Sequence, residues 1–441
     1  MKKIRTISII VLSFIVFTSF FSPFINLVNA APVTYNLHIE NVRNSEPIPD
    51  VVYGKYKSDV NGNMVVTSNI NSTITLTRKY FFSKSIVLGS QTNIDVKMDQ
   101  DMDALANGIP NTQRILRVTY NPIENKKSFE EYYYSSKWAN GQNGGSLTNF
   151  QNLTFSKLEN TFEVITKNKV DYRIVGSMNV TTVTPGLNGY AVDLANFSKC
   201  IYGASTYDSD WCGKNVLDVV DHPRFIKDNH ICEKAAQVKA DEIWVMAVPA
   251  LIKWEAFMVS PGKQYELNGP SFTISGCPKA MNVLAFSYEA DQNAMHNYGH
   301  ATESALRYLT GMWDQSMIDY HLERFYRRSK YWDLLPTPAP IHCGNDHYPF
   351  NTLNAYFYWV PDQVENNCAD WGNFPNYTGV TQTFGCEKWN CIDWDWQMLW
   401  IGSMPQNTGT SYMLYADGKS YKVMNNWWNY VRRPDLAILF R

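Results

Sequence analysis

The chain has 441 residues, a nearly balanced charge of 39 Lys and Arg against 41 Asp and Glu, and a 14% share of aromatic side chains. A balanced charge gives no extended positive field, so it predicts neither a nucleic-acid partner nor binding to an anionic membrane surface. The length is enough for two or three domains of ordinary size.

Residues 1–31 have the pattern of a secretory signal peptide. Three basic residues precede an apolar run over residues 7–28, and the run ends in the small residues Ala30 and Ala31. The run is long enough to remain as a membrane anchor, but the small residues at its end favour cleavage of the signal peptide. We therefore expect a secreted, extracellular protein with no membrane insertion after cleavage.

Eight cysteines occur, all of them after residue 199. An even number of cysteines in an exported protein predicts disulfide bonds. Spacing suggests Cys200 with Cys212 and Cys386 with Cys391 as local pairs, while other pairings remain open. No Cys-x-x-Cys pair is present, which argues against a structural zinc–thiolate site.

Residues 32–105 read as short alternating strands separated by turns. The expected strands cover residues 34–39, 63–67, 73–77, 84–88 and 93–98. Alternation of period two without helical periodicity predicts a small β-sandwich domain. Its turn at residues 59–63 is similar to turns of the sandwich modules found beside secreted peptidases and surface enzymes, which implies a spacer, adhesion or carbohydrate-contact role. A plain folding accessory is the alternative.

Residues 112–441 form the second expected domain, in which strands alternate with helices. Strands are expected at residues 114–120, 170–175, 243–248 and 282–286, and helices at residues 223–240 and from residue 289 onward. This order is typical of an α/β fold with a mostly parallel sheet. Ligands of such sheets bind beyond the carboxyl ends of the strands, where the second helix begins.

That second helix carries five ionisable residues on one stripe. Steps of about 100° per residue bring together Glu289, His296, His300, Glu303 and Arg307. Most of the remaining circumference is apolar, so we expect the polar stripe to line a cavity. His296 and His300 stand one turn apart, the spacing at which a helix can offer two imidazoles to one metal ion.

A catalytic zinc ion takes about three protein ligands and keeps a position open for water. His347, in a later loop, is the candidate third ligand, with Glu303 as an alternative. Asn297 follows the first histidine, so the H-E-x-x-H motif of zinc peptidases, with its glutamate base, is absent. The candidates for the general base are Glu289, Glu303, Glu242 and Glu255.

The same side chains also fit sites without metal. A carboxylate beside a histidine can perform acid and base catalysis directly. Alternatively, the two histidines are hydrogen-bonded in a polar seam between helices. For Glu255, a solvated loop position is the favoured interpretation.

The C-terminal region is rich in tryptophan: seven of the 14 fall between Trp371 and Trp428. We expect an aromatic-rich cap over the cleft, with Trp371, Trp396, Trp428 and Arg307 as candidate substrate-binding residues. Core packing is the alternative role of these rings.

Six short motifs occur in a fixed order between residues 114 and 441. They are Asp241-Glu-Ile-Trp244, Ser287-Tyr-Glu289, His296-Asn-Tyr-Gly-His-Ala-Thr-Glu-Ser304, Cys343-Gly-Asn-Asp-His-Tyr-Pro349, Asp370-Trp-Gly-Asn-Phe-Pro375 and Asn425-Asn-Trp-Trp428. The set resembles the motifs of a family of uncharacterised secreted, hydrolase-like proteins from bacteria and fungi. The resemblance implies that His296, His300, Glu303, His347 and Trp371 share one site, but it implies no reaction.

The chain departs from this family at Tyr356-Phe-Tyr-Trp359, where the family pattern is Asp-Tyr-Asp-Trp. If those aspartates act as ligands or bases, Tyr356 and Tyr358 have removed that function. The departure weakens the expectation of an active enzyme.

Two functions therefore stay open. The first is a metal-dependent hydrolase, with zinc as the expected ion, acting on an extracellular polymer, peptide being slightly favoured over glycan. The alternative is a non-catalytic extracellular protein that binds a cell-surface glycan on a decayed enzyme scaffold. No feature of the sequence indicates an oligomeric state.

Overall fold

The computed structural model describes residues 31–440 except 44, 136–146, 187–191, 201–207, 209, 211–219, 249–250, 253, 288–290, 311–342, 353–355 and 415–418. Nearly all of the expected signal peptide lies outside this range. None of the helices in the described residues is long and apolar enough to cross a membrane.

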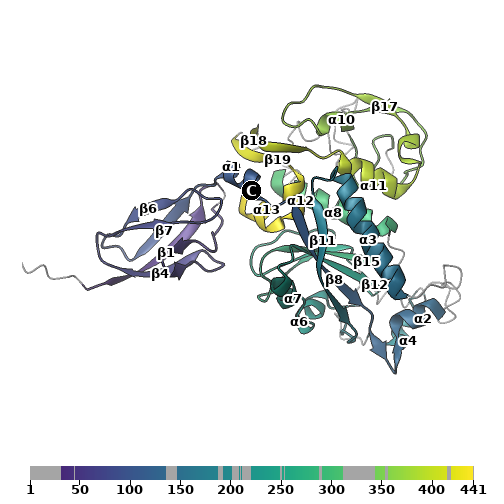
Figure 1. Cartoon of the computed structure of the whole chain (residues 1–441), viewed down its shortest axis with the longest axis horizontal. Helices are drawn as coiled ribbons and strands as arrows, with labels where there is room; N and C mark the ends of the chain where they lie inside the picture. Colours follow the sequence, from purple (N-terminus) through teal and green to yellow (C-terminus); the bar gives the residue numbers. More distant parts are fainter. Residues whose placement is uncertain are drawn as a thin grey trace, which may run out of the picture.

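The N-terminal region consists of three small sheets (Figure 1). β1 (Val33–Asn41) lies between the antiparallel β4 (Asn63–Ser68) and the parallel β7 (Asn93–Met98). Two short pairs complete it: β2 (Val52–Tyr53) with β3 (Tyr56–Lys57), and β5 (Thr73–Leu76) with β6 (Lys84–Val87). Buried and exposed residues alternate along β4, as expected for a strand with one face on a core. The strands are thus confirmed, whereas their arrangement as a two-sheet sandwich stays a prediction.

The larger region is built on a six-stranded sheet with the order β11-β8-β12-β15-β13-β14. These strands are β8 (Thr112–Tyr120), β11 (Asp171–Val180), β12 (Glu242–Ala247), β13 (Ala256–Ser260), β14 (Ser271–Thr273) and β15 (Met281–Ser287). The first four in the sheet order run parallel, while β13 runs antiparallel to β15. The expectation of a mixed α/β fold with a mostly parallel sheet is confirmed.

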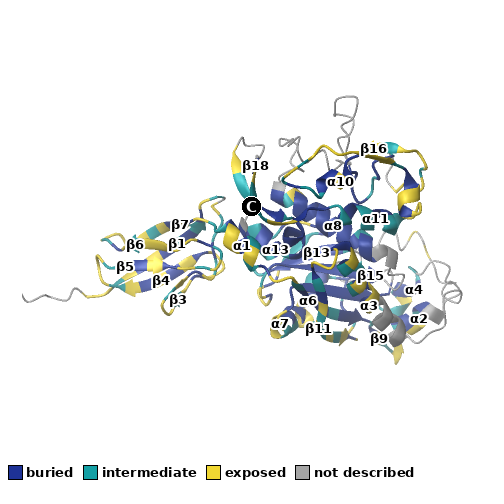
Figure 2. Ribbon diagram, turned by 45° about the horizontal axis from the view of Figure 1, so that its top comes forward, coloured by how far each residue is buried: buried dark blue, intermediate teal, exposed yellow. Residues whose placement is uncertain are grey.

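Helices cover both faces of this sheet, whose strands are largely buried (Figure 2). Every residue of β12 is buried for this reason. On one face, Trp244 packs against Phe162 of α3 (Leu147–Ile165), and Phe162 also contacts Tyr298 of α8 (Asp291–Thr310). On the other face, Tyr120 packs against Phe225 of α6 (His222–Asp228). α8 therefore lies directly on the sheet.

The helix expected over residues 223–240 is instead two helices, α6 and α7 (Ile231–Val238). His230 between them has φ of 53°, a left-handed conformation that interrupts the helical hydrogen bonds. Helical periodicity continued across this break, so the sequence pattern did not reveal it.

The remaining described elements are short. They are β9 (Ile123–Glu124), β10 (Lys127–Ser128), α1 (Met102–Gly108), α2 (Phe129–Ser135), α4 (Leu194–Ser198), α10 (Cys368–Trp371), α11 (Asp393–Gly402), α12 (Trp428–Arg432), α13 (Pro434–Phe440), β16 (Val364–Asn366), β17 (Gln382–Phe384), β18 (Gln406–Leu414) and β19 (Ser420–Asn426). α11 packs on α8 and so closes the C-terminal region over the sheet (Figure 1).

Disulfides brace the larger region. Cys386–Cys391 is confirmed, and Cys232–Cys277 and Cys343–Cys368 join segments 45 and 25 residues apart. Cys200 is also disulfide-bonded, but its expected partner Cys212 lies outside the described residues.

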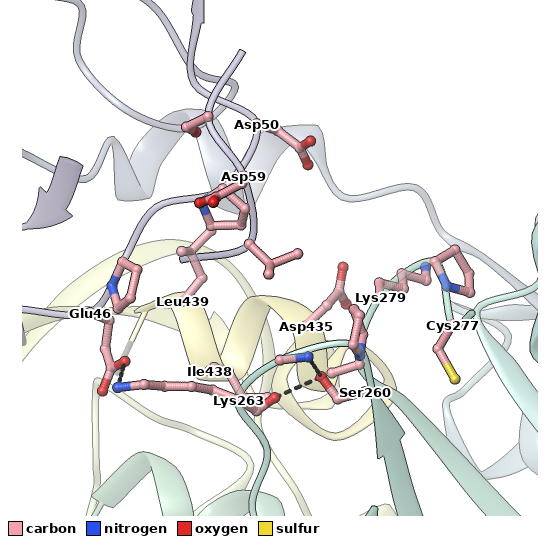
Figure 3. Close-up of a pocket in the computed structure, with 18 of the residues that line it drawn as sticks. Glu46, Asp50, Asp59, Ser260, Lys263, Cys277, Lys279, Asp435, Ile438 and Leu439 are labelled. Atoms are coloured by element: carbon pink, nitrogen blue, oxygen red, sulfur yellow. Dashed lines mark hydrogen bonds and ion pairs between the residues drawn. The ribbon is translucent and has the colours of Figure 1, made fainter. Parts of the chain in front are cut away.

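The two regions meet at the C-terminal helix. The buried side chain of Asn41 donates a hydrogen bond to the carbonyl of Leu439 at 2.8 Å, and Gln100 donates to the same oxygen at 3.0 Å. Beside these contacts, a cavity of about 700 Å³ is bordered by the ion pair of Glu46 and Lys263 (Figure 3). Four acidic and four basic side chains border it, and Asp50 also pairs with Lys57 and Arg78.

Candidate metal centre

Three histidines converge where α8 meets the loop that follows Cys343. The Nε2 atoms of His296 and His300 lie 3.1 Å apart, and those of His296 and His347 lie 3.4 Å apart. Three nitrogen ligands of a tetrahedral zinc ion, each at about 2.0–2.1 Å from the metal, are separated by about 3.3 Å. The observed spacing is therefore compatible with one ion between the three rings.

The outer nitrogens of two of these rings face carboxylates. His296 Nδ1 lies 3.1 Å from Asp346 Oδ2, and His300 Nδ1 lies 3.8 Å from Glu303 Oε2. Metal-binding histidines commonly present the outer N–H to a carboxylate, which orients the ring and leaves the other nitrogen free for the ion. The arrangement thus favours Nε2 as the inward, ligating atom.

Asp346 belongs to the same cluster. With His296, His300 and His347 it forms a group whose potential ligand atoms all lie within 4.8 Å of one another, so this cluster could hold a metal ion. Its carboxylate is fully buried, and burying a charge without a compensating partner is costly. Gly299 makes room for it, because a Cβ atom at that position would overlap Asp346 Oδ1.

Glu255 reaches the cluster from the solvent side. Its Oε2 lies 3.2 Å from His300 Nε2 and 3.6 Å from His296 Nε2, and its side chain is 42% exposed. β13 runs antiparallel to β15, so Glu255, just before β13, stands at the carboxyl end of the parallel strands. Glu255 is thus a partly exposed loop residue, as the favoured interpretation had it, but the direction of β13 also brings its carboxylate to the histidines.

Charge in the cluster is strongly coupled. Burial lowers the pKa of His296, but hydrogen bonds to Asp346 and Glu255 outweigh it and raise the pKa to about 9. Burial likewise lowers the pKa of His300, but hydrogen bonds to Glu255 and Glu303 outweigh it and raise the pKa to about 10. Burial opposes a low pKa of Glu255, yet the two histidines hold that pKa far below its usual range. Burial lowers the pKa of His347.

With neutral imidazoles, three carboxylates remain in the site: Glu255, Asp346 and Glu303. The donor set of imidazole nitrogens and carboxylate oxygens is that of divalent transition metals. A cation would therefore take over from the two imidazolium groups the balancing of these carboxylates.

The loop that carries His347 is held from several sides. The Asn345 side chain accepts hydrogen bonds from the backbone of His347 at 3.0 Å and of Tyr348 at 2.9 Å. Trp396 Nε1 donates to the Asn345 carbonyl at 2.9 Å, and the hydroxyl of Tyr358 donates to the Asp346 carbonyl at 3.2 Å. Fixed in this way, His347 is a rigid third member of the cluster.

Other residues singled out from the sequence lie elsewhere. Glu242 stands at the amino end of β12, where its carboxylate accepts hydrogen bonds from Gln113 and Trp244, and burial raises its pKa to about 7. Arg307 lies on an exposed position in the last turn of α8. Glu289 falls outside the described residues.

The three candidate tryptophans are core residues. Trp371, Trp396 and Trp428 are each 0% exposed, so none presents a ring face to a ligand in this structure. Trp396 still serves the site through its bond to the loop of His347.

The fold and the site together define a mixed α/β protein with a His/Asp cluster that could hold a metal ion. Comparison with protein-family models, with curated proteins and with solved structures found no match. The resemblance to secreted hydrolase-like proteins therefore stays a prediction.

Proposed function

We propose that this protein is a secreted, metal-dependent hydrolase of an extracellular polymer, with zinc held by His296, His300 and His347. The observation that carries the proposal is the convergence of the three Nε2 atoms at 3.1 and 3.4 Å. The disulfides support an oxidising, extracellular location.

Glu255 is the proposed general base or fourth ligand. It faces the same nitrogens as the ion would, and it is the most exposed carboxylate of the cluster. A bound divalent ion supplies Lewis acidity and makes water easier to deprotonate. Once the two histidines bind an ion as neutral imidazoles, they no longer hold the Glu255 pKa down, and the carboxylate can accept a proton from water that enters beside it.

Glu303 and Asp346 act as positioning residues in this proposal. Glu303 Oε1 accepts a hydrogen bond from the Asp346 backbone N–H at 3.2 Å, and both carboxylates face outer imidazole nitrogens. Asp346 Oδ2 also lies 3.5 Å from His347 Nε2, so this carboxylate is in addition a candidate fourth ligand. They orient the rings and do not reach the substrate, because both side chains are buried.

The alternative of a decayed, non-catalytic scaffold loses two of its supports. The tryptophans that were to bind glycan are buried, and the site keeps three carboxylates although Tyr356 and Tyr358 replace the family's aspartates. We therefore favour the enzyme.

Metal content of the purified protein tests the proposal. We expect about one zinc or similar ion per chain, removable by chelators with a fall in melting temperature. His300→Ala should lose the ion, whereas His38→Ala should keep it, because His38 contacts Asn63 and Glu40 in the N-terminal sheets. Absence of a stoichiometric ion, with a chelator-insensitive melting temperature, would falsify the metal role.

Turnover is tested separately on a panel of peptide and glycan polymers. Glu255→Gln should lower the rate by roughly 10²–10⁴-fold, the contribution typical of a general base, with folding intact. A rate equal to that of the wild type would remove Glu255 from the reaction.

A further inference from the structure

Three aromatic side chains next to the metal centre are exposed. Tyr356 is 53% exposed, Phe357 40% and Trp359 58%, and the rings of Phe357 and Trp359 lie 5.1 Å apart with 31° between their planes. We call these three residues the aromatic platform. Large exposed apolar groups gathered at one place commonly mark a binding surface.

Tyr356 is the member of the platform that touches the proposed active site. The Tyr356 ring lies 4.7 Å from the His347 ring, and the Tyr356 backbone N–H donates a hydrogen bond to the His347 carbonyl at 2.8 Å. Tyr356 adopts φ of 65°, which is unfavourable for a bulky L-residue. The chain therefore holds Tyr356 beside the histidine in spite of its backbone preference.

The residue in the middle of this segment anchors it. Tyr358 points inward, where it is 5% exposed and its hydroxyl donates to the Asp346 carbonyl. Its own carbonyl accepts a hydrogen bond from Trp389 at 2.7 Å, and the carbonyl of Val360 accepts one from Asn351 at 2.8 Å. The exposed rings thus stand on a fixed base, which reduces the entropy lost when a ligand binds.

We propose that the aromatic platform binds the substrate of the metal centre and that this substrate is a glycan chain; the inference rests on the proposed hydrolase function. Extended peptides are recognised largely through main-chain hydrogen bonds. Here the Tyr356 N–H and the carbonyls of Tyr358 and Val360 are engaged within the protein. The segment also offers uncharged ring faces, and these match the apolar C–H faces of pyranose rings.

This assignment reverses the slight preference for peptide that the sequence suggested. In this proposal the aromatic platform, and not the buried Trp371, Trp396 and Trp428, is the sugar-stacking surface. A sugar ring stacked on Tyr356 would lie beside His347, and the neighbouring pair of Phe357 and Trp359 offers a second stacking position.

Retention of the full mature chain on cellulose, chitin and xylan, with gelatin as the peptide polymer, tests the proposal. We expect retention by at least one polysaccharide, and at least a tenfold weaker affinity for it in Trp359→Ala and in Phe357→Ala. The matched control is Tyr412→Ala, which removes a 72% exposed aromatic ring on β18 and should bind like the wild type. Metal content and melting temperature of each variant establish that the fold is intact.

Several outcomes would contradict the proposal that the platform binds glycan. These are retention on gelatin alone, no retention on any polysaccharide, or equal losses in the platform and control variants. The platform and the metal role fail independently. If no metal is found but Trp359→Ala abolishes glycan retention, only the hydrolase proposal fails; if metal is present and retention is unchanged, only the platform fails.

Discussion

His347 is the single residue on which the candidate centre depends most. His296 and His300 are adjacent on α8 by helical geometry alone, and such a pair is common in structural roles. His347 comes 47 positions after His300 in the chain, yet its Nε2 lies 3.4 Å from His296 Nε2. Helix geometry does not account for the position of His347, which comes from a distant loop. With it, the pair of His296 and His300 becomes a potential three-ligand site.

Metal affinity should depend on pH, because the ligands must lose protons. The raised pKa values of about 9 and 10 for His296 and His300 mean that both are protonated at neutral pH without metal. Their contribution to metal-free stability is complete below about pH 6.5 and is lost as pH rises towards these values. We expect zinc to bind more tightly from pH 6 to pH 8 with proton release, measured by titration calorimetry in buffers of different ionisation enthalpy. Binding without proton release would contradict the histidine assignment.

Gly299 should not tolerate a side chain. Gly299→Ala places a Cβ against Asp346 Oδ1, and we expect a loss of about 1–3 kcal/mol in the free energy of unfolding, with weaker metal binding. Gly402→Ala is the matched helical control: its nearest heavy atom would be 3.7 Å away in Ile165. Chemical denaturation that finds the two variants equally stable would argue against the close packing of Asp346.

At the scale of elements, the site is assembled by one strand reversal and one cross-linked loop. Reversal at β13 carries Glu255 to the edge where α8 starts. The loop of His347 begins at Cys343, which is bonded to Cys368. Neither feature involves α8 itself, so the helix supplies two of the candidate ligands and its neighbours supply the rest.

The Cys343–Cys368 disulfide should stabilise both the fold and the centre. In the chain-entropy account, closing a separation of 25 residues contributes about 3.5 kcal/mol, against about 2 kcal/mol for the five-residue separation of Cys386 and Cys391. Replacing each pair by serines, we expect the larger loss of stability and the larger loss of zinc affinity for Cys343 and Cys368. Equal zinc affinities in the two variants would show that the loop holds His347 without its disulfide.

At the scale of the whole molecule, the N-terminal sheets are attached by buried hydrogen bonds as well as surface ion pairs. Asn41 is completely buried where it contacts Leu439, whereas Lys263 is 56% exposed where it meets Glu46. Exposed ion pairs contribute little because water competes for both charges. The buried Asn41 side chain instead makes two hydrogen bonds, donating to the Leu439 carbonyl and accepting from the Arg43 backbone N–H, and alanine loses both.

Asn41→Ala should therefore lower the free energy of unfolding more than Lys263→Ala. We expect the first to lower the free energy of unfolding by about 1–3 kcal/mol and the second by less than about 1 kcal/mol. Thermal and denaturant unfolding of both variants provides the measurement. A larger effect of Lys263→Ala would mean that the ion pair holds the two regions together.

Much of this architecture followed from sequence alone. Period-two alternation located the N-terminal strands, apolar runs located β8, β12 and β15, and helical spacing placed His296, His300 and Glu303 on one face of α8. These features are local, because backbone geometry fixes how residues a few positions apart are oriented. Short-range spacing also predicted the pair of Cys386 and Cys391.

Only the tertiary structure decided which distant groups meet. It brought Glu255 and Asp346 to the histidines, left Glu242 at the amino end of its strand, and buried Trp371, Trp396 and Trp428 while exposing Trp359. The direction of β13, the path of the loop and the burial of each ring depend on packing between segments far apart in the chain. A sequence pattern of short period carries no information on those contacts. The tertiary structure was therefore needed to identify the residues around the histidine pair.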